Sequence, residues 1–367
     1  MARSGIIYGS TGSRKTTQGK WLAHRVASLT GKATLLLSMD GGGWGPMQPE
    51  VDAGMIEPFY CDPGLVPLPT LRKVSQGYWP EDPSQPASAI NLKPMNYAKF
   101  GGLIVEGWTS ITSAAMRYLP DRGINVGGEE REKLGGFSQG VTVDGREEKQ
   151  TFRSNTRGDY GFVQNFLYGL VMNFNSLPLY YVLYTALESK TEDDDRSTIY
   201  GPAISGKKAT SQCGAWIGDL IHAQDYAVKS TVNVPDPADA TKTIPQELID
   251  VKVRFYYKKH PDPATGILFP AKPRVTPERV RDLERAFPGG YFESDESGGF
   301  DRYLAKVDEL SARQAESLKG WRERMDAKLR GTGIAPKAAG DKAEITRADT
   351  PPPARSVPPT PPPAPTK

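Results

Sequence analysis

Short runs of apolar residues alternate with amphipathic stretches along the first 275 residues of the chain. Each run is too short for a core helix and is bounded by glycine or polar residues, so it predicts a buried strand. Strands are expected at residues 5–9, 33–38, 55–60, 102–106, 179–185 and 221–228, with helices at 15–29, 110–119, 160–174 and 206–219. Strands that alternate with helices are typical of an α/β fold with a mostly parallel sheet. Apolar and polar residues alternate in a further strand at 250–257, as in an edge or antiparallel strand.

Two long segments interrupt this pattern. Residues 62–99 contain prolines at 63, 67, 69, 80, 83, 86 and 94, which disfavour regular elements. Residues 120–158 are rich in glycine and charge and have almost no aliphatic periodicity. We therefore expect both segments to be surface excursions, the second of them a mobile loop.

The C-terminal quarter has a different character. A short helix is expected from Thr276, with Pro277 at its first position, and a longer one from Phe300 to about Arg330. We interpret the apolar stripe of the longer helix as packing within the chain, with a neighbouring subunit as the alternative. Residues 331–367 are rich in proline and lack aromatic residues, which predicts a disordered tail, either a spacer or a segment that binds a partner. The expected organisation is a core over 1–275, a helical segment over 276–330 and the tail.

The composition narrows the possible classes of function. The 46 basic and 43 acidic residues give a net charge of +3, so no overall basic character favours nucleic acid. The two cysteines are too few for a disulfide framework, which favours a reducing environment inside the cell. No apolar run approaches the roughly 18 residues of a membrane helix, and the N-terminus does not resemble a signal peptide. A soluble, cytoplasmic protein is the expectation.

The strongest motif lies directly after the first expected strand. The phosphate-loop pattern G-x-x-x-x-G-K-[ST] is met at Gly9, Lys15 and Thr16, although Arg14 stands where the second glycine is usual. In such loops backbone N–H groups and a helix N-terminus surround an anion, and the lysine contacts the terminal phosphates. The expected nucleotide-binding residues are Gly9, Ser10, Thr11, Gly12, Ser13, Arg14, Lys15, Thr16 and Thr17. The alternative is an ordinary Gly-Ser turn before a helix.

Two acidic residues follow neighbouring strands. Glu106 ends the strand at 102–106, where it can bind Mg²⁺ together with the hydroxyl of Thr16. Asp40 follows the strand at 33–38 and is the candidate for polarising the attacking water. Each is otherwise a common kind of acidic residue in a loop after a strand. Together with the loop they predict a site for ATP and Mg²⁺.

These motifs give the chain a resemblance to a known family. The sequence Gly5-Ile-Ile-Tyr-Gly precedes the loop, Leu37-Ser-Met-Asp-Gly-Gly follows the next strand, and Leu103-Ile-Val-Glu-Gly-Trp-Thr-Ser comes later. With Gly158-Asp-Tyr-Gly161 before a long helix, then Leu177-Pro178 and the strand to Thr185, residues 3–275 resemble the small RecA-like P-loop ATPases of bacteriophages. The resemblance implies an ATPase that acts in DNA recombination, annealing or replication, in the host cytoplasm if the protein is viral.

The resemblance also implies partners and further site residues. RecA-like subunits form rings or filaments, and Lys272 and Arg274 resemble the residues that such subunits extend to the γ-phosphate of a neighbour. A solvated basic pair is the alternative. Where relatives carry a polar phosphate sensor this chain has Leu187, so Thr185 or Glu188 would have to serve. Single-stranded DNA would contact the loop at 120–158, where RecA-like proteins place DNA-binding loops.

Other functions stay open at this point. Arg14 could mark a degenerate loop in a structural or assembly protein, and a DNA-packaging motor or a nucleotide kinase could use the same loop. His24, His222 and His260 have no partners at ligand spacing and are not expected to be catalytic. The stretch Arg254–Lys259 mixes aromatic and basic residues, and we interpret it as a strand with a basic end rather than a surface for nucleic acid.

Overall fold

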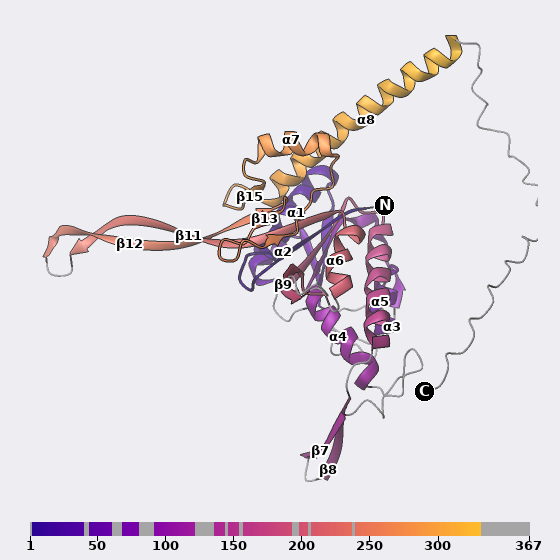
Figure 1. Cartoon of the computed structure of the whole chain (residues 1–367), viewed down its shortest axis with the longest axis vertical. Helices are drawn as coiled ribbons and strands as arrows, with labels where there is room; N and C mark the ends of the chain where they lie inside the picture. Colours follow the sequence, from indigo (N-terminus) through magenta and orange to yellow (C-terminus); the bar gives the residue numbers. More distant parts are fainter. Residues whose placement is uncertain are drawn as a thin grey trace, which may run out of the picture. The chain divides into compact units, whose positions relative to one another are not determined.

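The structure is a computed structural model of the whole chain (Figure 1). It describes residues 2–39, 44–60, 68–80, 92–121, 136–143, 146–153, 157–192, 198–204, 207–236 and 239–331. The chain forms two compact units, residues 1–313 and 314–367. The described part of the second unit is the end of one helix, and the fold below is that of the first unit.

The first unit is built around one sheet of mixed direction. Its order is β15-β12-β11-β1-β9-β6-β2-β3, with β10 beside β9. The strands of the chain are β1 (Arg3–Gly9), β2 (Ala33–Ser38), β3 (Ile56–Tyr60), β4 (Tyr78–Pro80), β5 (Leu92–Pro94), β6 (Phe100–Glu106), β7 (Gly136–Val143), β8 (Arg146–Arg153), β9 (Tyr181–Glu192), β10 (Thr198–Pro202), β11 (Asp219–Asp236), β12 (Asp239–Tyr256), β13 (His260–Pro261), β14 (Leu268–Phe269) and β15 (Tyr291–Glu293). The pairs that join β11, β1, β9, β6, β2 and β3 are parallel. β10, β12 and β15 add antiparallel pairs.

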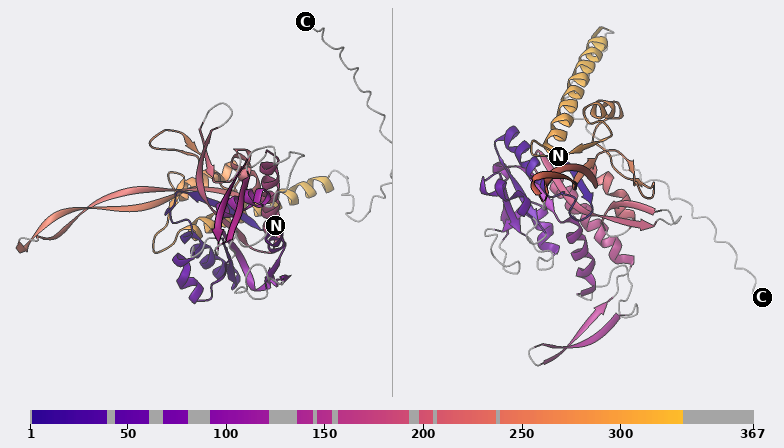
Figure 2. Two further views of the ribbon diagram at one scale, coloured as in Figure 1. Left: turned by 90° about the horizontal axis from the view of Figure 1, so that it is seen from below. Right: turned by 90° about the vertical axis from the view of Figure 1, so that its left-hand side faces the viewer.

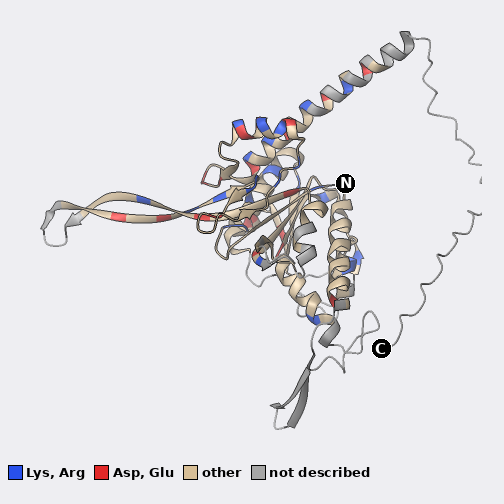
Figure 3. Ribbon diagram, viewed as in Figure 1, with Lys and Arg blue, Asp and Glu red and all other residues tan. Residues whose placement is uncertain are grey.

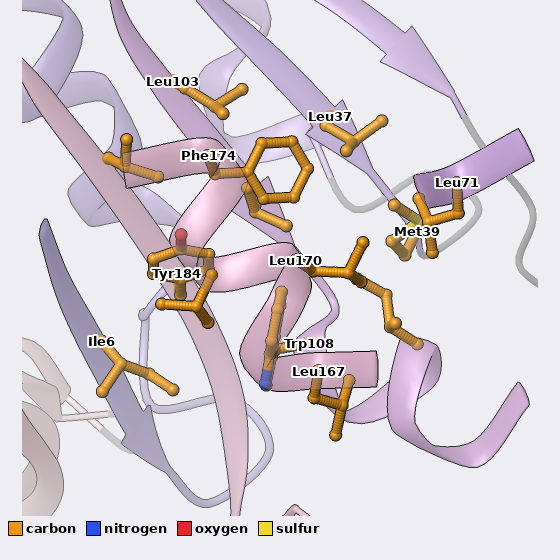
Figure 4. Close-up of a cluster of buried hydrophobic side chains, with 14 of the residues drawn as sticks. Ile6, Leu37, Met39, Leu71, Leu103, Trp108, Leu167, Leu170, Phe174 and Tyr184 are labelled. Carbon is orange, nitrogen blue, oxygen red and sulfur yellow. The ribbon is translucent and has the colours of Figure 1, made fainter. Parts of the chain in front are cut away.

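Helices cover both faces of this sheet. They are α1 (Thr17–Thr30), α2 (Gln48–Asp52), α3 (Leu68–Ser75), α4 (Trp108–Asp121), α5 (Arg157–Ser176), α6 (Lys207–Trp216), α7 (Pro277–Ala286) and α8 (Phe300–Gly331), with 3₁₀ turns at Gly45–Met47 and Tyr97–Lys99. On one face, Ile6 and Leu103 pack with side chains of α3, α4 and α5, among them Trp108 and Phe174 (Figure 4). On the other face, Ile7 packs with side chains of α1 and of the start of α8. Successive residues of β1 therefore belong to different core layers, as the alternation of side chains along a buried strand requires.

Close packing fixes α1 against β6. A Cβ atom on Gly102 would lie 2.8 Å from Cγ2 of Val26, and one on Gly101 would lie 2.6 Å from Cγ1 of the same side chain. Glycine at these two positions lets the helix backbone approach the strand. This contact holds the helix that follows the phosphate loop against the strand that ends in Glu106.

The α/β class with a mostly parallel sheet is confirmed, and each expected strand and helix of the core is present. Most bounds agree within a few residues, but β9, β11 and β12 are longer than predicted. β12 pairs with β11 in the antiparallel direction, as the alternation at 250–257 indicates. The β11–β12 pair is much longer than expected. Its outer part is a twisted two-stranded ribbon in which apolar side chains such as Ile249 and Val251 are exposed (Figure 2, left panel). The outer part mixes exposed polar and apolar residues, so it lacks the run of apolar residues by which the core strands were predicted.

The prediction that residues 62–99 and 120–158 lack regular elements is wrong. The first segment contains α3, β4 and β5 and buries Leu71 and Trp79 in the core. Pro69 stands in the first turn of α3, where a missing N–H costs no helical hydrogen bond. The second segment contains the β7–β8 hairpin, and α5 begins within it. Asp40 and the tail from residue 332 lie outside the described residues.

No helix in the described part of the chain is long and apolar enough to span a membrane.

Candidate functional site

The predicted phosphate loop lies at the carboxyl end of β1, in the middle of the sheet. Gly9, the last residue of β1, pairs with Leu187 of β9 on one side and with Ala223 of β11 on the other. A Cβ atom on Gly9 would lie 2.3 Å from the carbonyl oxygen of Ala223, so only glycine fits this contact. The loop runs from Ser10 to Thr16 and leads directly into α1.

The backbone of the loop turns through two left-handed residues. Gly12 has a φ of 83°, and Arg14 has a φ of 52°, the only positive value for a residue other than glycine in the described part of the chain. Arg14 thus adopts the conformation that glycine favours at this place of the pattern. Its guanidinium donates a hydrogen bond to the carbonyl oxygen of Val251 on β12, at 3.3 Å. The side chain is therefore directed toward β12.

The ammonium group of Lys15 occupies the centre of the loop. It donates hydrogen bonds to the carbonyl oxygens of Gly9, at 3.1 Å, and of Ser10, and to Oγ of Ser13, at 3.1 Å. Burial lowers the pKa of Lys15 to about 8, against the opposing effect of nearby Glu188, Asp225 and Glu106. The hydrogen-bond partners of the Lys15 ammonium group are thus neutral oxygens of the loop. Since none of these partners is a carboxylate, the positive charge can still bind an anion.

Several backbone N–H groups of the loop are also available to bind an anion. Within the described residues, the N–H groups of Gly12, Arg14 and Lys15 donate to no protein acceptor. Unpaired N–H groups beside a lysine and a helix N-terminus form an anion-binding concavity.

Thr16 connects the loop to the second acidic candidate. Its hydroxyl donates a hydrogen bond to Oε1 of Glu106, a residue 90 positions further along the chain. Glu106 is buried, 4% exposed, at the end of β6. A hydroxyl and a carboxylate in contact beside a phosphate loop are the protein ligands that Mg²⁺ shares with nucleotide phosphates.

The donor set fits Mg²⁺ rather than a metal held by protein alone. No three His, Cys, Asp or Glu side chains of the described residues gather around a common point. Mg²⁺ keeps several waters and uses phosphate oxygens, so one carboxylate and one hydroxyl from the protein suffice.

The two residues considered for sensing phosphate have different environments. Thr185 is buried, and its hydroxyl accepts a hydrogen bond from the backbone N–H of Gly107 at 3.2 Å. Glu188 follows Leu187, which pairs with Gly9 at the loop. Glu188 is also near the ammonium group of Lys15, whose pKa it raises.

Two of the histidines expected to be without partners lie beside Glu188. His222 on β11 and His260 on β13 form a hydrogen-bonded chain with Glu188, although 34 and 38 residues separate the partners. The available signal was a histidine, His222, that follows the apolar residues Leu220 and Ile221 of a predicted strand. That signal could not reveal the partners of His222, because they are brought together by the order of the strands in the sheet.

Lys272 and Arg274 lie at the other end of the strands. Lys272 forms a β-bridge with Leu220, near the start of β11, and the backbone N–H of Arg274 bonds to Asp219. Leu220 pairs with Ile6 of β1, whereas the loop begins after Gly9. Both basic side chains are exposed. They are thus separate from the loop of their own chain.

The stretch Arg254–Lys259 includes the end of β12, as interpreted from the sequence. The guanidinium of Arg254 lies 3.9 Å from the ring centroid of Tyr226 and 4.6 Å from that of Tyr291, and it bonds to Glu293. The Arg254 side chain is thus engaged within the sheet.

Comparison of the sequence with protein-family models and with characterised proteins gave no match.

Proposed function

We propose that the chain binds a nucleoside triphosphate with Mg²⁺, ATP by preference, and hydrolyses it as a RecA-like P-loop ATPase. The observation that carries the proposal is the constellation of Lys15, Thr16 and Glu106. The ammonium group lies in the loop, and the neighbouring hydroxyl bonds to a buried carboxylate on another strand. In this proposal Lys15 contacts the terminal phosphates, and Thr16 and Glu106 hold Mg²⁺, which neutralises charge on the phosphates.

The position of the loop in the sheet supports the same proposal. After β1 the chain builds β2, β6 and β9 on one side of β1 and later adds β11 on the other side. Ligands of open α/β sheets bind at the carboxyl ends of strands where the strand order reverses in this way. The loop of residues 10–16 lies at that point.

A role in DNA recombination, annealing or replication is the second part of the proposal, and it rests on the order of the sequence motifs. Single-stranded DNA, a homo-oligomeric ring or filament and a partner of the tail belong to this part. Acidic and basic residues are mixed along β12 and α7, so these two elements present no continuous run of basic residues (Figure 3). DNA-stimulated turnover is therefore measured separately from basal hydrolysis.

The first test is Lys15→Ala, with Lys20→Ala on the helix that follows the loop as the matched control. Removing a charge-assisted contact to phosphate costs about 2–3 kcal/mol, so affinity for Mg-ATP should fall about 30- to 150-fold. Calorimetric titration measures the affinity, and release of inorganic phosphate, with and without single-stranded DNA, measures turnover. The Lys20→Ala protein should keep both values of the wild type.

The rival function, a degenerate loop in a structural or assembly protein, makes the opposite prediction. The wild-type protein at high concentration would then give no heat with Mg-ATP. Unchanged binding and turnover in the Lys15→Ala protein would also overturn the proposed site.

A further inference from the structure

Three polar side chains from three strands form one hydrogen-bonded chain beside the phosphate loop. Nε2 of His222 lies 3.0 Å from Oε2 of Glu188, and Nδ1 of His222 lies 2.8 Å from Nε2 of His260. His222 is 1% exposed and His260 is 8% exposed. Two imidazoles this deeply buried need polar partners, and in this arrangement they have each other and Glu188.

Aromatic rings hold both imidazoles in place. The ring of Phe269 stacks on His222 with centroids 3.9 Å apart, and Tyr256 stacks on His260 with centroids 3.5 Å apart. Tyr8, one residue before the loop glycine, packs against His222 from β1, with centroids 4.9 Å apart. The orientation of the two imidazole rings is therefore fixed by packing.

The direction of the hydrogen bonds follows from charge. Burial lowers the pKa of His222, and burial together with the neighbouring His222 lowers the pKa of His260 to about 4, so both rings are neutral near pH 7. An ionised Glu188 only accepts, so His222 donates through Nε2. Nδ1 of His222 then accepts from Nε2–H of His260.

The chain ends at the site of the phosphates. Glu188 follows Leu187, the residue that pairs with Gly9. Of the acidic residues near Lys15, Glu188 raises the pKa of that ammonium group the most. One third of its side chain, 33%, is exposed, whereas Glu106 is buried and bonded to Thr16. Of the two carboxylate oxygens of Glu188, only Oε2 has a hydrogen-bond partner among the described residues. The other carboxylate oxygen can accept one from water.

We propose that Glu188 is the catalytic base of the hydrolysis, and that His222 and His260 are positioning residues that orient its carboxylate. This inference rests on the proposed function. The oxygen of a water molecule attacks the γ-phosphorus, and a proton of that water passes to Glu188. The bond between the γ-phosphorus and the bridging oxygen breaks, and ADP leaves with the electron pair of that bond. The products are ADP and inorganic phosphate, and the proton of Glu188 returns to solvent.

Glu188→Gln is the decisive variant, because the amide still accepts a hydrogen bond from His222 but cannot take a proton. General-base catalysis contributes about 10²- to 10⁴-fold, so kcat should fall at least 100-fold while Mg-ATP affinity stays within about threefold. Glu247→Gln is the matched control, since it makes the same substitution at an exposed glutamate of β12 that pairs with Lys229 and is not part of the histidine chain. Its kcat should stay within about twofold of the wild type.

His222→Leu and His222→Gln together test the positioning role with a readout that a structural role would not move. Leucine removes the donor to Glu188, whereas the amide N–H of glutamine can replace it. The kcat should therefore fall about tenfold in the leucine variant and largely recover in the glutamine variant, with Mg-ATP affinity within about threefold of the wild type in both. An equal loss of kcat in the two variants would overturn the positioning role.

The outcomes separate the two proposals. A wild-type protein that does not bind Mg-ATP overturns the proposed function together with this inference. A wild-type protein that hydrolyses ATP, with a Glu188→Gln variant of equal kcat, overturns the inference alone. Mg-ATP binding by each variant shows that it is folded. If a variant of His222 does not fold, Glu188→Gln still decides, because the side chain of Glu188 is partly exposed.

Discussion

At the residue scale, Arg14 shows how a loop keeps its conformation without the usual glycine. A left-handed φ destabilises a residue with a Cβ atom by about 1–2 kcal/mol. Arg14, with a φ of 52°, carries this strain. Its guanidinium is directed to the carbonyl oxygen of Val251, away from the hydrogen bonds of Lys15. The departure from the sequence pattern therefore affects stability first, and the phosphate contacts of the proposed site do not depend on it.

This account predicts the order of two variants. Arg14→Ala keeps the left-handed φ, whereas Arg14→Gly relieves it, so the glycine protein should be the more stable by about 1 kcal/mol after the extra freedom of its unfolded chain is subtracted. Urea unfolding of both proteins measures the difference. Lys32 is exposed and has no positive φ, so there the glycine variant should be the less stable one. An alanine variant at Arg14 that equals or exceeds the glycine variant would contradict the strain.

At the scale of elements, His260 attaches the β13–β14 pair to β11 through its bond to His222. In the folded chain its pKa is lowered to about 4, from an ordinary value of 6.5. The unfolded chain therefore takes up this proton at a higher pH than the folded chain does. The stability that the neutral ring contributes is complete above about pH 6.5 and is lost as the pH falls toward 4.

Urea unfolding at pH 7 and pH 5 tests this linkage. Each pH unit in that window changes the free energy of unfolding by up to about 1.4 kcal/mol per group, so the wild type should lose on the order of 2 kcal/mol, with His222 acting in the same direction. His260→Gln should lose clearly less between the two pH values. His24 and His222 remain in both proteins, so the difference reports on His260, and parallel pH dependences would contradict the linkage.

The same scale shows what the sequence could predict. The core strands were predictable because each is a short apolar run, and Lys15, Thr16 and Glu106 because a loop and a strand end mark them locally. The ribbon of β11 and β12 was not, because its outer residues are exposed and its apolar side chains are scattered among polar ones. α3 was not predicted, because the prolines around it disfavour a helix in general. A proline in the first turn of a helix, such as Pro69, is nevertheless tolerated. The chain of Glu188, His222 and His260 depends on strand order, which no local pattern encodes.

At the scale of the whole molecule, the open question is how Lys272 and Arg274 could serve a nucleotide site. Lys272 pairs with Leu220, near the start of β11. The phosphate loop of the same chain follows Gly9, at the opposite, carboxyl end of the parallel strands. If these two cations contact nucleotide, the nucleotide is that of a neighbouring copy. If they do not, Arg274 is a structural residue whose backbone N–H bonds to Asp219.

Mixed assemblies of two inactive variants distinguish these roles. Lys15→Ala lacks a working loop but keeps both cations, whereas the double variant Lys272→Ala and Arg274→Ala keeps the loop. In a co-expressed equimolar ring or filament, about a quarter of the subunit contacts would join an intact loop to intact cations, because a head-to-tail contact brings a different surface from each partner. We expect phosphate release to recover to about a quarter of the wild-type rate. A mixture no more active than either variant alone would show that the two cations do not act across a subunit contact.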